Sequence, residues 1–435
     1  MRHAIRISLA CAVAMMCLAT AGPALAGKTV CSSGCLTTSI QAAINAASPG
    51  ATITIGAGNY YENLVIDKSL TLRGSGDATV IYPAVSHPVC PPESGSLCGG
   101  TASNIILVEA NNVTISRLSL DGDNPNLTSG VVRGGADIDA RNGIITNHEV
   151  GVYNGLTVSK VKVADIYLRG IYASSGGTFD FDHDTVENVQ GEEESIAMFN
   201  FGGSGEMSDN AVTNANDGIS ANWSTGTKFL DNKISKSGSG IHTDNNGGGG
   251  GEADLIEGNG VSECAVNGYG IFVFVPYLSA TVKANKISGC SVGLAAYGGA
   301  VAGQGPTFAD NTINGTGAAT TGTTYGAYLT TDQLGYEYGD MTATVTGNTF
   351  SHLDTGMFVT QTNPSPGQPA GGQATVNAST NNSFVKDGTG ATGEPGTAVT
   401  AEEDWWGCAS GPNAGRACNT ATGTVAFTPW LTAKP

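Results

Sequence analysis

Asp217, His242 and Asp244 are the residues of this sequence that are best suited to acid/base chemistry. His242 and Asp244 are separated by one residue in the stretch GIHTD (240–244), so on a β-strand both side chains point to the same side. Asp217 stands directly before the glycine of a similar stretch, GISAN (218–222). An imidazole exchanges protons near neutral pH, and a carboxylate beside it can share that work. If the protein is an enzyme, we expect these three residues to be catalytic.

Aromatic residues occupy matching positions in neighbouring stretches. Aligned on their first glycine, or on Ser195 in its place, the stretches read GIYAS (170–174), SIAMF (195–199), GISAN (218–222), GIHTD (240–244), GIFVF (270–274), GLAAY (293–297) and GAYLT (326–330). The outward side chains that we expect to bind a sugar chain are Tyr172, Phe199, Asn222, Trp223, Phe272 and Phe274. Exposed rings would stack against sugars, whereas rings covered by loops would only pack within the protein.

Other interpretations of the acidic residues stay open. The alignment places Glu194 one stretch before Asp217, and stacked carboxyl groups about 5 Å apart would match the pair of a retaining glycosidase. Alternatively, the carboxylate oxygens bind Ca²⁺; otherwise we expect no cofactor. The plainer interpretation is a solvated acidic turn beside a histidine that has no catalytic role.

These positions depend on a repeat in which two apolar residues flank a polar one, as in FLDNKI (229–234). The polar residue falls at Asp184, Asn210, Asn232, Asn259, Asn285, Asn311 and Asn348. A short regular period without helical periodicity indicates a solenoid of β-strands. We therefore predict an all-β, right-handed parallel β-helix of about ten rungs in which the asparagines stack into a ladder.

The composition limits the partners of the protein. The chain of 435 residues contains 63 glycines and has a formal net charge of -18. Such a surface repels nucleic acid and anionic lipid, so we expect no nucleic-acid partner. No run of basic residues is present, which weighs against an anionic polysaccharide as substrate.

The first 26 residues have the pattern of a secretory leader, with two arginines, an apolar run and an Ala-x-Ala site at 24–26. We therefore predict a secreted protein, extracellular or periplasmic, and no membrane span follows the leader. Eight cysteines remain, an even number that suits an oxidising compartment. The pairs that we predict are Cys31–Cys35, Cys90–Cys98, Cys264–Cys290 and Cys408–Cys418.

The beginning of the mature chain predicts a helix over 39–47 (SIQAAINAA), followed by alternating strands and the turn GNYYE (58–62). This opening resembles that of secreted right-handed parallel β-helix proteins of the pectin-lyase-like superfamily. The asparagine repeats resemble the repeats of that group, and DWWG (404–407) and PWL (429–431) resemble its closing segment. The resemblance implies a β-helix over 27–400 with an N-terminal helical cap, and a closing segment over 401–435.

The resemblance does not select one activity, because the superfamily contains lyases, hydrolases, esterases, epimerases and non-catalytic proteins. Asp182-His183-Asp184 is similar to the end of an alginate epimerase motif, but the motif's first aspartate and proline are missing. We expect a protein that binds a polysaccharide on the outer face of the glycine-isoleucine strands and, if it is an enzyme, cleaves it. The alternatives are a non-catalytic surface protein and a uronate lyase or epimerase.

Overall fold

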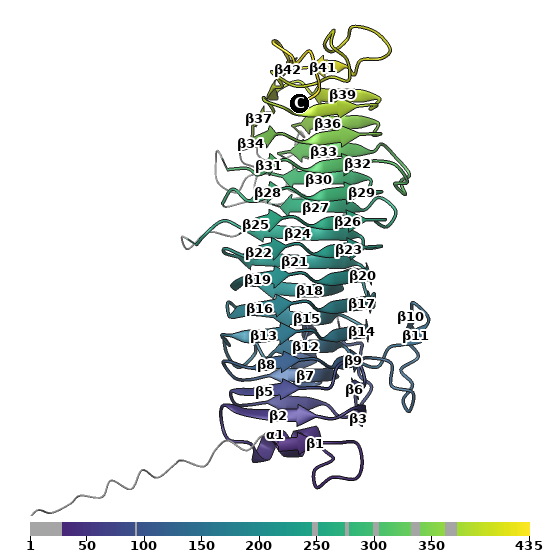
Figure 1. Ribbon diagram of the computed structural model, residues 1–435, viewed down its shortest axis with the longest axis vertical. Coiled ribbons are helices and arrows are strands. Elements are labelled where there is room, and N and C mark those ends of the chain that lie inside the picture. Colours follow the sequence, from purple (N-terminus) through teal and green to yellow (C-terminus); the bar gives the residue numbers. More distant parts are fainter. Residues whose placement is uncertain are drawn as a thin grey trace, which may run out of the picture.

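A computed structural model describes residues 28–91, 94–245, 251–274, 278–298, 304–331, 340–361 and 372–435. These residues form one long stack of short strands, with a helix at the N-terminal end and the C-terminal segment at the other end (Figure 1). The expected leader, residues 1–26, lies outside the described part of the chain. Within that part, no helix is long and apolar enough to cross a membrane.

Three parallel sheets make up the stack, and neighbouring strands in a sheet come from successive coils. Within the described residues, the strands of the 15-strand sheet follow in the order β1 (Lys28–Val30), β2 (Ala51–Ile55), β5 (Leu70–Arg73), β8 (Thr114–Ser116), β13 (Leu156–Ser159), β16 (Thr178–Asp182), β19 (Ser204–Ser208), β22 (Lys228–Leu230), β25 (Leu255–Glu257), β28 (Thr281–Lys283), β31 (Thr307–Ala309), β34 (Met341–Thr346), β37 (Ala374–Asn377), β40 (Ala398–Thr400) and β42 (Val425–Ala426).

The other two sheets are built in the same way. Over the described residues, the 12-strand sheet runs β3 (Gly58–Tyr61), β6 (Thr79–Tyr82), β9 (Ser119–Asp121), β14 (Lys162–Ile166), β17 (Thr185–Val189), β20 (Ala211–Ala215), β23 (Lys233–Ser235), β26 (Gly260–Ser262), β29 (Lys286–Ser288), β32 (Thr312–Asn314), β35 (Thr349–Ser351) and β38 (Ser383–Val385). The 13-strand sheet runs β4 (Leu64–Ile66), β7 (Asn104–Val108), β12 (Asn142–Thr146), β15 (Arg169–Ala173), β18 (Ile196–Phe201), β21 (Asp217–Ser224), β24 (Ser239–Asn245), β27 (Tyr269–Phe274), β30 (Val292–Tyr297), β33 (Tyr325–Thr330), β36 (Thr355–Thr360), β39 (Thr389–Gly393) and β41 (Ala421–Gly423).

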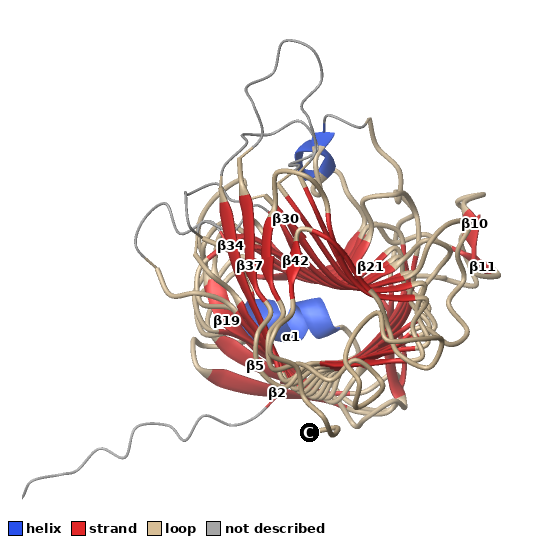
Figure 2. Cartoon of the chain, turned by 90° about the horizontal axis from the view of Figure 1, so that it is seen from above, coloured by secondary structure: helices blue, strands red, loops and turns tan. Residues whose placement is uncertain are grey.

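Each coil visits the three sheets in turn, so the cross-section is a three-sided tube around one apolar core (Figure 2). Alternate residues of each strand point inward, as in β2, where Ile53 and Ile55 are fully buried and Thr52 and Thr54 are exposed. The predicted all-β parallel helix is confirmed, and the sheets have more strands than the about ten rungs we expected. The repeat does not mark every coil: Val161 takes the ladder position before Asp184, and its backbone N–H donates to Asp184 Oδ1 at 2.8 Å.

The predicted asparagine ladder lies in the turn between the 15-strand and 12-strand sheets. Asn232 donates its backbone N–H and its side-chain amide to Asn259 Oδ1, each at 2.9 Å. The same amide donates to Met207 O in the preceding coil at 2.8 Å, so one asparagine joins three coils. The ladder continues past the predicted members to Asn382, whose backbone N–H donates to Asp404 Oδ1 at 2.8 Å. A buried carboxyl group therefore ends the ladder at each end, Asp184 at one and Asp404 at the other.

Both ends of the apolar core are covered. Helix α1 (Ile40–Ala46) closes the first coil with its buried residues Ile40, Ala43 and Ile44. Glu62, in the turn that follows β3, accepts hydrogen bonds from the backbone N–H groups of Ile40 and Gln41 at 2.8 and 2.9 Å, which satisfies free donors at the start of the helix. At the other end, the ring of Trp406 is fully buried and stacks on Phe384 at 4.7 Å.

Disulfides join all four of the cysteine pairs that the sequence predicted. Cys264–Cys290 links adjacent coils across a Cα separation of 4.8 Å. The pairs that close local loops are Cys31–Cys35, Cys90–Cys98 and Cys408–Cys418. Four disulfides are typical of a protein of an oxidising compartment.

Long insertions leave the stack at its corners. Residues 83–103 include the short 3-10 helix η2 (Cys98–Gly100). A second insertion forms the antiparallel hairpin of β10 (Val132–Arg133) and β11 (Ala136–Asp137), which stands outside the three sheets (Figures 1 and 2).

Candidate functional site

Asp217 and His242 meet on the outer face of the 13-strand sheet. Asp217 begins β21 and pairs in register with Ser239 of β24, three residues before His242. His242 Nδ1 lies 3.7 Å from Asp217 Oδ2, and Ser239 Oγ donates a hydrogen bond to Asp217 Oδ1. A cavity of about 510 Å³ opens beside the pair, lined by Gln190, Glu193, Ala215, Asn216, Asp217, Lys236, Gly238, Ser239, His242, Ala265, Tyr269 and Phe272.

Each member of this pair favours the charged form of the other. Burial lowers the pKa of His242, but the polar contact with Asp217 and the negative charge of that carboxylate outweigh it, and the net pKa is raised above the usual 6.5. Burial raises the pKa of Asp217, but the contact with His242 outweighs it and the net pKa is lowered. Below the raised pKa of His242, the pair is therefore an imidazolium and a carboxylate. Within the described residues, Nε2 of His242 has no hydrogen-bond partner, so Asp217 alone orients the ring through a polar contact.

Asp244 lies two residues beyond His242 but contacts a different group. The register between β21 and β24 shifts between Asn222 and Ser224, which marks a β-bulge at Trp223. Trp223 has a φ of 55°, which is rare for a bulky side chain, and its side chain is 54% exposed. Its backbone N–H donates to Asp244 Oδ1, so Asp244 holds the bulge that turns the indole outward.

The surroundings of Asp244 shift its pKa in the opposite direction from that of Asp217. Burial raises the pKa of Asp244 to about 7, and the charge of Asp254 adds to this, while His242 and the Trp223 N–H act in the opposite direction. Asp244 is therefore partly protonated near neutral pH, whereas Asp217 is ionised. Two carboxyl groups whose pKa values are pushed apart on one face are suited to acid and base roles.

The rings on this face stack on one another along the solenoid axis. His242 and Phe272 have centroids 4.8 Å apart and planes 20° apart, and Tyr328 and Phe358 are 5.6 Å and 22° apart. Phe272 is half-buried and lines the cavity, and its role in binding sugars stays a prediction. Trp223 is instead among the exposed aromatic side chains.

Tyr172 and Phe199, two expected sugar-binding residues, are buried. They are 6% and 5% exposed and form a separate apolar cluster with Leu97 and Ile145. Leu97 belongs to the insertion 83–103, so a loop covers these rings. The sequence analysis left this alternative open, and the structure supports it for the lower part of the face. The remaining expected contacts, Asn222 and Phe274, are half-buried on the part of the face that lies higher in the stack.

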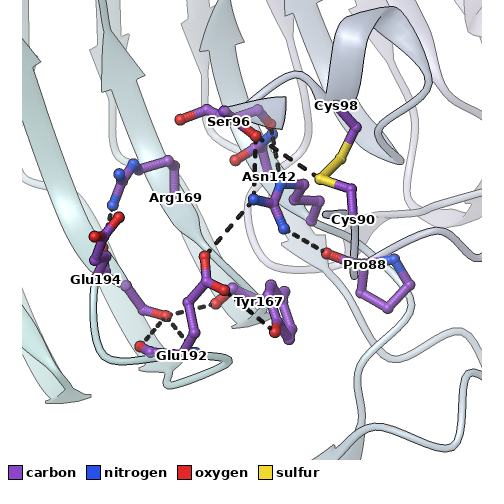
Figure 3. A network of polar contacts seen from close by, with 12 residues as sticks. Pro88, Cys90, Ser96, Cys98, Asn142, Tyr167, Arg169, Glu192 and Glu194 are labelled. Atoms are coloured by element: carbon purple, nitrogen blue, oxygen red, sulfur yellow. Dashed lines mark hydrogen bonds and ion pairs between the residues drawn. A yellow bond between two sulfur atoms is a disulfide. The ribbon is translucent and has the colours of Figure 1, made fainter. Parts of the chain in front are cut away.

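Arg141 fixes the covering loop, and its partners Pro88, Ser96, Tyr167 and Glu192 are seen in Figure 3. Its guanidinium is 3% exposed and donates to the carbonyl oxygens of Pro88 at 2.9 Å and Ser96 at 3.2 Å. It also lies 3.6 Å from Glu192 and over the ring of Tyr167 at 5.5 Å. A buried charge with this many partners holds the loop closed over Tyr172 and Phe199 in the structure.

The proposed stacking of Glu194 on Asp217 is wrong. Asp217 pairs with Ile196, and Ile219 pairs with Met198 rather than with Ile196. The sequence alignment placed Ser195 in the glycine position, but that position belongs to Ala197. Because the true register is shifted by two residues, the carboxyl pair of a retaining glycosidase does not form between these residues.

Tyr269 was missed by the sequence analysis, although it lines the cavity and stacks on Phe272 at a centroid distance of 5.4 Å. The residues directly before the glycines also line up on this face, because Asp217, Ser239 and Tyr269 pair in register on successive strands. Aligning the stretches one residue earlier would have included it. Lys236 and Glu193 also line the cavity, but they lie in neighbouring turns and no repeat in the sequence marks their positions.

Asp182, His183 and Asp209 form a separate polar cluster at the turn before the ladder. One ligand atom from each lies within 4.8 Å of the others, an arrangement that could hold a metal ion. His183 Nδ1 is 2.5 Å from Asp182 Oδ1. Asp184 belongs to the ladder, so the similarity to an epimerase motif does not extend to a triad here.

Comparisons with known proteins agree with this architecture. The family model described as right-handed beta helix region matches residues 142–313. The chain is similar to the A-module of the mannuronan C-5 epimerase AlgE6 of Azotobacter vinelandii, with 18% identity, a TM-score of 0.55, and coverage of 90% of this chain and 94% of that one. It is also similar to the catalytic domain of a GH87 α-1,3-glucanase, with 16% identity, a TM-score of 0.58, and coverage of 87% and 69%. Among curated proteins, none matches the sequence.

These findings define the class as right-handed parallel β-helix proteins. The chain has the right-handed parallel β-helix fold that its repeats predicted.

Proposed function

We propose that the protein binds a polysaccharide in the cavity on the outer face of the 13-strand sheet and cleaves it by acid/base chemistry. The observation that carries this proposal is the His242–Asp217 ion pair, which lies in a cavity walled by Tyr269 and Phe272. The predicted leader and the disulfides are in keeping with a secreted protein that meets such polymers outside the cytoplasm.

The chemistry follows from the different protonation of the two carboxyl groups. Asp217 is held as a carboxylate and is the base that accepts a proton from the attacking water, and the imidazolium of His242 beside it keeps this carboxylate ionised. Asp244, with a pKa of about 7, supplies the acid, and the bulge that it holds presents Trp223 as a wall for a sugar ring.

The comparisons support a carbohydrate ligand. The epimerase is named for mannuronan and the glucanase for an α-1,3-glucan, so both names denote action on a polysaccharide. The TM-scores of 0.55 and 0.58 indicate a shared fold, and identities of only 18% and 16% limit the likeness to that fold, so the type of bond attacked has to be measured on this chain.

Replacing His242 by alanine is expected to reduce cleavage at least about a hundredfold, because general acid/base groups contribute roughly 10²–10⁴-fold to rate. The measurement is a panel of neutral and acidic polysaccharides assayed for reducing ends and for unsaturated products. Activity should also fall as pH rises through about 7, because Asp244 then loses its proton.

Trp223→Ala is the matched variant for binding, because it removes the exposed indole and leaves the ion pair in place. It should weaken polysaccharide binding while His242→Ala binds normally. Equal product formation by wild type and His242→Ala on every active substrate would exclude the catalytic half of the proposal. Absence of binding to the whole panel would exclude both halves.

A further inference from the structure

A second groove lies on another side of the solenoid, on the outer face of the 12-strand sheet. Its volume is about 440 Å³, and it crosses strands β17, β20, β23, β26 and β29. Its walls are Thr185, Ala211, Val212, Thr213, Lys233, Ile234, Ser235, Gly260, Val261, Ser262, Lys286 and Ser288. None of these residues lines the cavity beside Asp217 and His242.

Lysines and small residues alternate along one line of this groove. The register places Lys233 beside Gly260 and Gly260 beside Lys286. Adjacent strands are about 4.8 Å apart, so the backbone positions of the two lysines are about 10 Å apart, with the glycine between them. Around Gly260 the space is open: a Cβ built there would meet no atom within 4 Å. The groove therefore has a gap the width of a side chain, with a cationic residue on each side.

Hydroxyl groups form a parallel line next to the lysines. Thr213, Ser235, Ser262 and Ser288 follow one another in register on successive coils. Ser235 Oγ donates to Thr213 Oγ1 at 3.1 Å, which leaves further hydrogen-bonding capacity on each hydroxyl. Such a line can donate to and accept from the hydroxyl groups of a sugar chain.

The side chains of Lys233 and Lys286 are exposed to solvent. In the described part of the chain neither Lys233 nor Lys286 forms an ion pair. Three other lysines at nearby turns and strands are paired: Lys162 with Glu187 at 2.6 Å, Lys236 with Glu263 at 4.0 Å, and Lys283 with Glu257 at 3.1 Å. The chain has a net charge of -18, and this groove carries two cations whose charges are free to attract an acidic ligand.

We infer that this groove binds a linear acidic polysaccharide, with a carboxylate or sulfate group over Gly260 between Lys233 and Lys286 and sugar hydroxyls along the serine line. The charge spacing favours such a polymer over nucleic acid. Duplex DNA carries one negative charge per about 1.7 Å of axis, which an acidic protein with two free cations in its groove repels. An acidic polysaccharide has sparser charges and many hydroxyl groups, which match both lines.

The sequence does not reveal this site, because its basic residues are not consecutive. Lys233 and Lys286 are far apart in the chain and come together only through the two intervening strand pairings. The inference does not depend on the activity proposed for the other face.

The test measures the affinity of the full-length protein for polygalacturonate, dextran sulfate and neutral dextran. Wild type should bind at least one of the two acidic polymers, and the comparison of the two identifies carboxylate or sulfate as the preferred group. Lys233→Ala combined with Lys286→Ala should weaken that binding at least about tenfold, because it removes both charged hydrogen-bond donors that flank Gly260. The control pair Lys228→Ala with Lys434→Ala changes the net charge equally outside the groove and should bind as wild type does.

Gly260→Leu separates a shaped site from general attraction between charges. It keeps both lysines but fills the gap, and it should weaken binding to a similar extent as the double lysine variant. His242→Ala should leave this binding unchanged. No binding of wild type to either acidic polymer, equal binding by the two double variants, or unchanged binding by Gly260→Leu would each overturn the inference.

Discussion

Replacing Asn259 by alanine is expected to lower the free energy of unfolding by about 3–6 kcal/mol, because it leaves several buried groups unpaired at about 1–3 kcal/mol each. Asn259 Oδ1 accepts two hydrogen bonds from Asn232, and its amide donates to Phe229 O and Asn285 Oδ1, all at 2.9 Å. Asn259 is fully buried, so water cannot replace these partners without disturbing the coil.

Denaturant unfolding of wild type and variant, followed by circular dichroism, measures this loss. Asn59→Ala is the control, because Asn59 is exposed on β3, and it should change stability by no more than about 0.5 kcal/mol. A loss below about 1 kcal/mol for Asn259→Ala would mean that the ladder is not a main source of stability.

Asp404→Asn is expected to stabilise the protein at alkaline pH. Burial raises the pKa of Asp404 to about 8, and its hydrogen bonds with Asn382 only partly offset this. An acid whose pKa is raised in the folded state contributes stability that is complete below its unfolded value and is lost as pH rises through the folded value. Wild type should therefore lose stability between about pH 4 and pH 8, in a range where asparagine does not titrate.

The gain from Asp404→Asn should be near zero at pH 4 and on the order of 3–5 kcal/mol at pH 9, since one pKa unit corresponds to about 1.4 kcal/mol. An amide at this position also extends the ladder chemistry, in which Asn382 donates to Val345 O at 2.8 Å. The measurement is the free energy of unfolding at both pH values. Glu402→Gln, a half-buried neighbour, is the control for loss of one charge. A stability difference that does not change with pH would contradict the assignment of a buried protonated acid at Asp404.

The sequence predicted the fold because the polar repeat and the fold share one cause. A buried amide must be paired, and an asparagine at Asn232 or Asn285 is paired only if the same turn recurs in the next coil. At Val161 the ladder position holds no amide, so the repeat did not mark that coil. The number of coils predicted from the sequence was therefore too low. The disulfide Cys264–Cys290 followed from the same register.

The candidate site was predicted less completely, because outward side chains are not constrained by the core. The contact between Asp217 and His242 followed from alignment on glycine, but Ala197 in the glycine position shifted one coil and misplaced Glu194. Burial of Tyr172 depends on where the insertion 83–103 folds back. No local pattern in the sequence records that Arg141 binds the carbonyl oxygens of that loop.

Titration of His242 by NMR measures whether Asp217 and His242 form an ion pair on the outer face. The imidazole signals are assigned by comparison with His242→Ala and followed with pH in wild type and in Asp217→Asn. We predict a pKa above 6.5 for His242 in wild type, since Asp217 stabilises the imidazolium, and a clearly lower pKa in the variant, where burial acts without the carboxylate. The same His242 titration curve in both proteins would show that the two side chains do not interact and would rule out an ion pair at this site.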